Sequence, residues 1–225
     1  MKAVIFDLFE TLITEWGHEK MTTRQCAAML GVPYEAFAAE MHLLHDAQYR
    51  GEITYAESLR LVCRTIGADV EDETFRLVTE KRRAAKAACF TALHADILPM
   101  LTALREQGLK TAILSNCSEE EILPLRNSVL APLMDEIILS YETALCKPDP
   151  AIYHLSAARL DVDCADCLFI GDGGSRELFG AAEAGMCAYR ALWYISAMPH
   201  PINEMPFPAL ASPTDVLRVR ELSLS

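Results

Sequence analysis

The hydrophobic positions of this chain follow two patterns, short continuous apolar runs and longer stretches with helical spacing. Continuous runs lie at 3–6, 109–114, 135–139, 167–171 and 186–190. Such runs are typical of strands in a parallel sheet that is covered on both faces. Stretches between the runs, such as Ile97, Leu101 and Leu104, have the spacing of an amphipathic helix. The pattern predicts an α/β fold with a doubly wound, Rossmann-like parallel sheet.

The span from 14 to 93 departs from this alternation, because helical spacing continues through it and no strand-like run interrupts it. We expect four helices there, from Thr22 or Thr23 to Gly31, from Pro33 to Leu44, from Thr54 through Leu59 and Val62, and from Glu71 to Cys89. This span predicts a small helical bundle inserted into the fold. We therefore expect two domains, a core of residues 1–13 and 94–225 and a helical domain of residues 14–93. A last helix is expected at 214–221.

Polar residues stand directly after three of the predicted strands. Asp7 follows the first strand, Ser115 and Asn116 follow the second, and Asp172 begins a glycine-rich turn that ends at Glu177. Ligands of open α/β sheets bind at such strand ends, although each residue taken singly is also a normal turn or helix-capping residue. The acidic pair in the glycine-rich turn favours a hard cation, because Mg²⁺ takes a few protein carboxylates and completes its shell with water and substrate oxygens.

A further candidate lies in the loop Cys146-Lys147-Pro148-Asp149-Pro150. The two prolines restrict the backbone on both sides of Asp149 and remove two donors. Lys147 is therefore presented from a stiff loop just before a predicted helix. Most lysines are solvated surface charges, so this loop gains meaning only together with the three strand ends.

Taken in order, these four segments resemble the haloacid dehalogenase (HAD) superfamily, whose members carry a DxDx(T/V) motif, a Ser or Thr, a Lys and a paired acidic loop. The resemblance covers essentially the whole chain. It rests on Asp7-Leu8-Phe9-Glu10-Thr11, Ile113-Leu114-Ser115-Asn116, Lys147-Pro148-Asp149-Pro150, and Gly171-Asp172 with Gly180-Ala181. It implies a HAD core whose inserted helical domain is a cap that closes over the site and selects the substrate.

The resemblance also implies roles for the catalytic residues. Asp7 would attack the substrate and form a covalent intermediate that water hydrolyses. Thr11 would hold the first loop, Ser115 and Asn116 would bind the transferred group, and Lys147 would steady Asp7 and the developing charge.

A magnesium site is implied at the same place. Mg²⁺ would bind Asp7, the backbone carbonyl of Phe9 and Asp172. Glu177 stands where the family more often has Asp, and its extra methylene favours contact with the ion through water.

Phe9 is the main departure from the family pattern, because HAD phosphatases usually carry an acid/base Asp at this position. Proton transfer from a positioned side chain is worth about 10² to 10⁴ in rate. Strand-like alternation predicts that Glu10 points away from the site. Glu15, His18 and Glu52 are other candidates for a substitute, although each is more simply interpreted as a solvated surface group. An aromatic residue at position 9 resembles the carbon-halide dehalogenases, in which halide leaves without a proton and no metal is required.

The sequence therefore favours a HAD-like hydrolase that is a Mg²⁺-dependent phosphatase of a small phosphorylated metabolite, acting through an aspartyl-phosphate on Asp7. Without an acid at Phe9 it would favour good leaving groups, such as aryl or acyl phosphates. A metal-free 2-haloacid dehalogenase and a catalytically weak binding or regulatory homologue stay open as alternatives. Against the dehalogenase, Asp172 and Glu177 would lie uncompensated beside the nucleophile if no cation were bound.

Composition and charge narrow the partners. The 225 residues carry a formal net charge of −12, which argues against nucleic acid or an anionic membrane as a partner. No signal pattern or membrane-spanning run is evident, so we expect a cytoplasmic enzyme, a monomer or homodimer, with its cysteines as thiols. Within the helical domain, Trp16, His18, Tyr49, Arg50 and Tyr55 are candidates to face the substrate, and Arg82, Arg83 and Lys86 are expected to form a solvated helix face.

Overall fold

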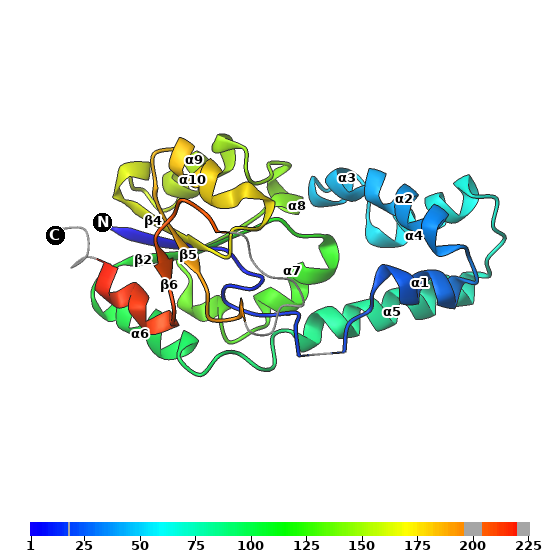
Figure 1. Ribbon diagram of the computed structural model, residues 1–225, viewed down its shortest axis with the longest axis horizontal. Helices are drawn as coiled ribbons and strands as arrows, with labels where there is room; N and C mark the ends of the chain where they lie inside the picture. Colours follow the sequence, from blue (N-terminus) through cyan, green and yellow to red (C-terminus); the bar gives the residue numbers. More distant parts are fainter. Residues whose placement is uncertain (18, 196–203, 220–225) are drawn as a thin grey trace.

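A single parallel sheet forms the centre of the computed structural model, which describes residues 1–17, 19–195 and 204–219. In this part of the chain the strand order is β3-β2-β1-β4-β5-β6, and every neighbouring pair is parallel (Figure 1). The predicted doubly wound α/β sheet is therefore confirmed. Its last strand was not predicted, because two residues are too short to show a hydrophobic pattern. The strands are β1 (Ala3–Phe6), β2 (Lys110–Ser115), β3 (Glu136–Leu139), β4 (Cys167–Gly171), β5 (Cys187–Ala191) and β6 (Ala209–Leu210).

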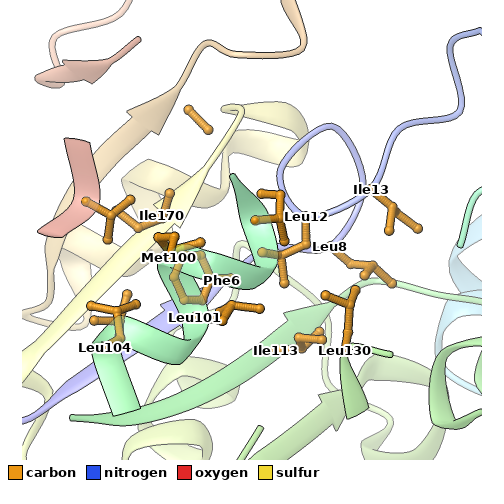
Figure 2. Packing of buried hydrophobic residues seen from close by; sticks show 14 of the residues in the cluster. Phe6, Leu8, Leu12, Ile13, Met100, Leu101, Leu104, Ile113, Leu130 and Ile170 are labelled. Atoms are coloured by element: carbon orange, nitrogen blue, oxygen red, sulfur yellow. The ribbon is translucent and has the colours of Figure 1, made fainter. Parts of the chain in front are cut away.

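Two hydrophobic clusters cover the two faces of the sheet, because successive side chains of a strand point to opposite faces. Val4 and Phe6 of β1 pack on one face with α6 (Ile97–Glu106) and η5 (Pro213–Arg218). Ala3 and Ile5 pack on the other face with α9 (Pro150–Arg159) and α10 (Glu177–Glu183). Figure 2 shows the first of these clusters around Phe6. The apolar side chains thus bury both faces of the sheet. The polar residues that follow the strands remain at its edge, where they can form a site.

The C-terminal segment differs in part from the expected helix at 214–221. The structure has a short 3₁₀ helix there, η5, and residues 220 and 221 lie outside the described residues. The remaining short core helices are α8 (Ser140–Thr143), η1 (Ala131–Leu133), η2 (Cys164–Asp166) and η3 (Gly174–Arg176).

A separate group of helices lies at one end of the molecule and encloses its own apolar cluster, which includes Cys26, Phe37, Leu59 and Val78 (Figure 1). We call this group the cap. Four of its helices match the predicted ones. The short α3 was not predicted, because Leu44 both ends α2 and begins α3 and the hydrophobic pattern shows no break there. The helices are α1 (Thr23–Leu30), α2 (Tyr34–Leu43), α3 (His45–Tyr49), α4 (Tyr55–Thr65) and α5 (Asp72–Ala88).

Side-chain capping explains why two of these helices begin where they do. Thr22 forms a capping box with Gln25 at the start of α1, and Thr54 forms one with Glu57 at the start of α4. Each box satisfies two backbone N–H groups that a helix start leaves without a partner. Among the described residues, no helix is both long enough and apolar enough to cross a membrane.

The cap rests on α7 (Glu119–Arg126), a core helix that begins with three consecutive glutamates. Each of the three carboxylates binds a different group of the cap. The Tyr55 backbone N–H donates to Glu119 at 3.1 Å, Arg82 Nε donates to Glu120 at 2.6 Å, and Lys86 Nζ lies 2.7 Å from a Glu121 oxygen.

This contact corrects the expectation that Arg82, Arg83 and Lys86 form one solvated helix face. The side chains of Arg82 and Lys86 are only 21% and 15% exposed, whereas Arg83 is exposed. Residues four apart on a helix lie on the same side, so Arg82 and Lys86 face α7 together. Composition alone did not show this, because the acids that bury these two cations belong to a distant part of the chain.

Candidate active site

Three strand ends meet at one edge of the sheet, as the sequence predicted. Asp7 follows β1, Ser115 is the last residue of β2, and Asp172 follows β4, which lies beside β1. A cavity of about 250 Å³ opens at this edge. Its lining includes the predicted site residues Asp7, Ser115, Asn116, Lys147, Asp172 and Glu177. The structure therefore brings together residues that are as much as 170 positions apart in the chain.

Lys147 joins the two acidic loops. Its ammonium group donates to a carboxylate oxygen of Asp7 and to one of Glu177, and all three side chains are buried. The other Asp7 oxygen accepts a hydrogen bond from Thr11 Oγ1 at 3.2 Å. Trp193 Nε1 in turn donates to the Thr11 carbonyl at 2.7 Å. These contacts leave the Asp7 carboxylate little freedom to rotate.

Asn116 fixes the loop that carries Lys147. Its side-chain Nδ2 donates to the Lys147 carbonyl at 2.9 Å, and its Oδ1 accepts from the Lys147 backbone N–H at 2.8 Å. Both ends of the amide are thus engaged with one backbone residue. Asn116 lines the cavity, but its side chain primarily positions Lys147.

Gly171 makes room for Glu177. A Cβ atom on Gly171 would lie 2.0 Å from Glu177 Oε1, so a larger residue here would displace the carboxylate. The same oxygen accepts a hydrogen bond from the Gly173 backbone N–H at 3.2 Å. The glycine-rich turn therefore folds the longer Glu side chain back over the end of β4, beside Asp7.

The charges of this cluster are unbalanced. Burial, together with the nearby Asp7 carboxylate, raises the pKa of Glu177 well above its usual value and also raises the pKa of Asp172. Burial alone would lower the pKa of Lys147, but the carboxylates of Asp7 and Glu177 outweigh burial and raise it. Lys147 therefore stays charged. Lys147 contacts two of the three carboxyl groups, Asp7 and Glu177, and the raised pKa values of Asp172 and Glu177 mean that this cluster favours binding positive charge, as a proton or as a cation.

This donor set fits a divalent cation. One oxygen each of Asp7, Asp172 and Glu177 lies within 4.8 Å of the others. Carboxylate oxygens are the ligands that Mg²⁺ takes, with water and substrate completing its shell. The fit therefore rests on the type of ligand and on the positive charge that a cation would bring to three neighbouring carboxyl groups.

The side of the cavity opposite the sheet contains residues that the sequence did not single out together. Phe9 lines it, and Lys86 Nζ lies 4.7 Å from the Phe9 ring centroid. Glu10 lines it too, which corrects the expectation that Glu10 points away. Its φ of 57° makes position 10 part of a turn, so strand alternation does not apply. Burial raises the pKa of the Glu10 carboxyl.

The cap and the segment leading to it complete the lining with Glu15, Tyr49 and Lys86, and α7 adds Glu121. Tyr49 and Glu15 were among the sequence candidates, whereas Lys86 was placed on the surface. One feature of the sequence could have indicated this position. Arg82 and Lys86 are spaced to lie on one side of their helix, and a helix with an acidic start is available to pair with them.

The other sequence candidates for this side lie elsewhere. Arg50 donates to the Ala144 carbonyl, and Tyr55 is buried within the cap. Trp16 lines a neighbouring cavity, and Glu52 is exposed. His18 lies outside the described residues.

Comparison with known proteins assigns the family. The model of the haloacid dehalogenase-like hydrolases matches residues 1–185. The chain belongs to the haloacid dehalogenase-like hydrolases. The resemblance inferred from the four sequence segments is thereby confirmed, and the chain is a HAD hydrolase.

Similar HAD hydrolases include both phosphatases and dehalogenases. The chain is 27% identical over 198 residues to the glyceraldehyde 3-phosphate phosphatase of Methanopyrus kandleri, covering 84% of this chain and 83% of the relative. It is also 27% identical over 165 residues to the (S)-2-haloacid dehalogenase of Pseudomonas fluorescens, covering 72% of this chain and 65% of the relative. Sequence similarity thus places the HAD hydrolase near both reaction classes.

A solved structure shows the same fold. A HAD family enzyme of Bacteroides thetaiotaomicron, crystallised in complex with magnesium and inorganic phosphate, has a TM-score of 0.64 at 22% identity. The match covers 85% of this chain and 94% of that chain. The core with its cap is therefore the fold of a HAD enzyme.

Proposed function

We propose that this HAD hydrolase is a Mg²⁺-dependent phosphatase of a small phosphorylated metabolite. The observation that carries the proposal is the cluster of Asp7, Asp172 and Glu177, in which one oxygen of each carboxyl group lies within 4.8 Å of the others and the Lys147 ammonium group contacts two of them. A bound Mg²⁺ would balance the negative charge of these carboxylates and would polarise the phosphoryl oxygens. A phosphatase among the similar proteins and a HAD structure containing magnesium support the same reaction class.

The residues of the site have the following roles in this proposal. Asp7 attacks phosphorus and forms an aspartyl-phosphate, which water then hydrolyses. Thr11 holds one Asp7 oxygen, and Lys147 neutralises the other while it faces the transferred group. Ser115 contributes a hydroxyl to the phosphoryl group. Asn116, proposed from the sequence as a further substrate contact, acts chiefly by fixing Lys147.

The cap determines which substrates enter. We propose that it corresponds to residues 14–93 and the core to residues 1–13 and 94–225, because the cap helices have a hydrophobic cluster of their own. The cavity of about 250 Å³ is small, which favours a compact metabolite. A cytoplasmic location agrees with the eight cysteines, all of which are free thiols.

The absence of an acid at position 9 makes the enzyme selective for its leaving group. Phosphoryl transfer passes through a loose transition state, in which positioning and charge neutralisation provide most of the rate enhancement. A site with a cation and Lys147 is therefore competent without an acid. It favours aryl or acyl phosphates, whose leaving oxygens need no proton.

A metal-free 2-haloacid dehalogenase is the second candidate, and Phe9 is the observation that favours it. Halide departure requires no proton, so an aromatic residue at position 9 would not slow that reaction. The cluster of carboxylates argues against it, since Asp172 and Glu177 would then lie beside Asp7 with no cation bound between them.

The deciding experiment measures phosphate release from a panel of phosphate esters, with Mg²⁺ and with EDTA, beside chloride release from 2-chloro acids. We expect phosphate release with Mg²⁺ only, and rates that fall from aryl to alkyl esters. Chloride release that survives EDTA would establish the dehalogenase instead. No turnover of either kind, with ligand binding that survives Asp7→Asn, would indicate a binding homologue.

A further inference from the structure

Lys86 on the cap helix α5 reaches the catalytic cavity from the side opposite the sheet. Its side chain is 15% exposed and lies between Glu15, in the segment leading to the cap, and Glu121 on the core helix α7. The ammonium group also lies 4.7 Å from the centroid of the Phe9 ring. It is therefore held beside the position whose side chain carries the acid in most HAD phosphatases.

The ammonium group has the capacity to bind a substrate as well. A lysine ammonium has three N–H donors. Glu15 and Glu121 account for two of them. The third can be donated to a substrate oxygen, and the two carboxylates keep the nitrogen in place while this happens.

The direction of phosphoryl transfer places the leaving group near Lys86. Asp7, Ser115 and Lys147 lie at the sheet edge of the cavity, so the nucleophile approaches phosphorus from that side. In such reactions the attacking and leaving oxygens are roughly in line with phosphorus. The leaving group therefore points toward the cap, where Glu15, Tyr49 and Lys86 line both the catalytic cavity and a second cavity of about 410 Å³.

Charge singles out Lys86 on that side. The lining of the catalytic cavity also includes the carboxylates of Glu10, Glu15 and Glu121. Among the described residues that line this cavity, the basic side chains are Lys147 and Lys86. An oxygen that becomes negative on the cap side would be surrounded by carboxylates if Lys86 were absent.

We propose that Lys86 stabilises the negative charge that develops on the leaving-group oxygen, which replaces the electrostatic part of the role of the missing acid. This inference rests on the proposed phosphatase function. As the bond between Asp7 and phosphorus forms, the bond from phosphorus to the leaving oxygen breaks, and the electron pair stays on that oxygen. Lys86 donates a hydrogen bond to it as the charge develops. A weakly basic aryl oxide leaves as the anion, whereas an alkoxide, which is more basic than an amine, takes the hydrogen-bonded proton, and the Lys86 amine then regains a proton from water.

The test is the dependence of kcat/KM on the leaving group, measured with Mg²⁺ on 4-nitrophenyl, phenyl and ethyl phosphate. In Lys86→Met we expect kcat/KM to fall by about 10²-fold on ethyl phosphate, the scale of one lost oxyanion donor. On 4-nitrophenyl phosphate it should fall by about threefold or less, because a weakly basic leaving oxygen needs little stabilisation. Lys86→Arg keeps the charge and should keep the dependence close to that of the wild type.

Arg82→Met is the matched control. Arg82 lies one turn earlier on α5 and binds Glu120 on the same helix α7; it lines the second cavity but not the catalytic cavity. A merely structural role for this contact would lower kcat/KM by the same factor on all three esters. Equal losses in Lys86→Met, or no loss, would overturn the inference while the proposed function stands. A wild-type protein that releases no phosphate from any ester would overturn both.

Discussion

The two lysines of the cavity have similar partners but belong to different parts of the molecule. Each ammonium group lies between two carboxylates, Lys147 between Asp7 and Glu177 and Lys86 between Glu15 and Glu121. The partners of Lys147 both belong to the core, since Asp7 follows β1 and Glu177 is the first residue of α10. Lys86 belongs to the cap, so it stays at the cavity only while α5 packs against α7. The core therefore holds one of the two positive charges of the cavity, and the cap supplies the other.

This difference predicts different chemical effects. In the proposed reaction Lys147 faces the transferred phosphoryl group, which is the same in every substrate, whereas Lys86 faces the leaving group, which changes from one substrate to the next. Loss of Lys147 should therefore affect all esters alike. Loss of Lys86 should affect them unequally.

Lys147→Met has the largest expected effect. We expect kcat/KM to fall by about 10³-fold on 4-nitrophenyl, phenyl and ethyl phosphate alike, because a charge that neutralises the phosphoryl group is lost. The variant also leaves buried carboxylates without their ammonium partner, which should lower the free energy of unfolding by about 3–5 kcal/mol in EDTA. Urea titration checks the stability, and added Mg²⁺ should recover part of it. A loss confined to ethyl phosphate would contradict the division of roles between the two lysines.

Phe9→Asp should have the next largest effect, in the opposite direction. A carboxyl group at this position can protonate the leaving oxygen, so we expect kcat on ethyl phosphate to rise by about 10²-fold. Turnover of 4-nitrophenyl phosphate should change little. Phe9→Leu removes the ring without supplying an acid and serves as the control. A similar gain in both variants would show that space, not a proton, limits the reaction.

Glu15→Gln tests the cap-side pair alone and should have the smallest effect. Burial tends to raise the pKa of the Glu15 carboxyl, but Lys86 and Lys20 outweigh burial and hold this pKa below its ordinary value of 4.5. The pair therefore stabilises the fold above the unfolded pKa, and this contribution is lost as the pH falls through the folded pKa. Removing it should lower the free energy of unfolding by about 0.2–1 kcal/mol at pH 7 and leave it unchanged at low pH.

Urea titrations at several pH values measure that cost. The exposed Glu52, changed to Gln, is the control for the substitution itself. A cost that persists unchanged in acid would mean that the charge of Glu15 is not what stabilises the contact.

The core site was largely predictable from the sequence, for a physical reason. Parallel strands place their carboxyl ends at one edge of the sheet, so Asp7, Ser115 and Asp172 had to lie close together once their strands were identified. Helix starts were equally local, since Thr22 and Thr54 form capping boxes with side chains only three residues away. These features depend on short-range geometry or on one simple topology.

The cap side of the site was not predictable in the same way. Lys86 looks like a surface residue because an amphipathic helix shows only that it has a polar face, not what that face contacts. Its burial depends on the packing of α5 against α7. Glu119, the first residue of α7, comes 31 positions after Ala88, the last residue of α5. The turn at Glu10 was missed because a glutamate in the sequence gives no indication that its φ is positive.

The start of α7 has a consequence for the whole molecule. Ser115 ends β2 and Glu119 begins α7, so a connection of three residues links a side chain that lines the candidate site to the helix on which the cap rests. An inserted or deleted residue in that connection would shift both at once. The candidate site and the contact that holds the cap therefore depend on the same three residues of backbone, and a change of length there would disturb both.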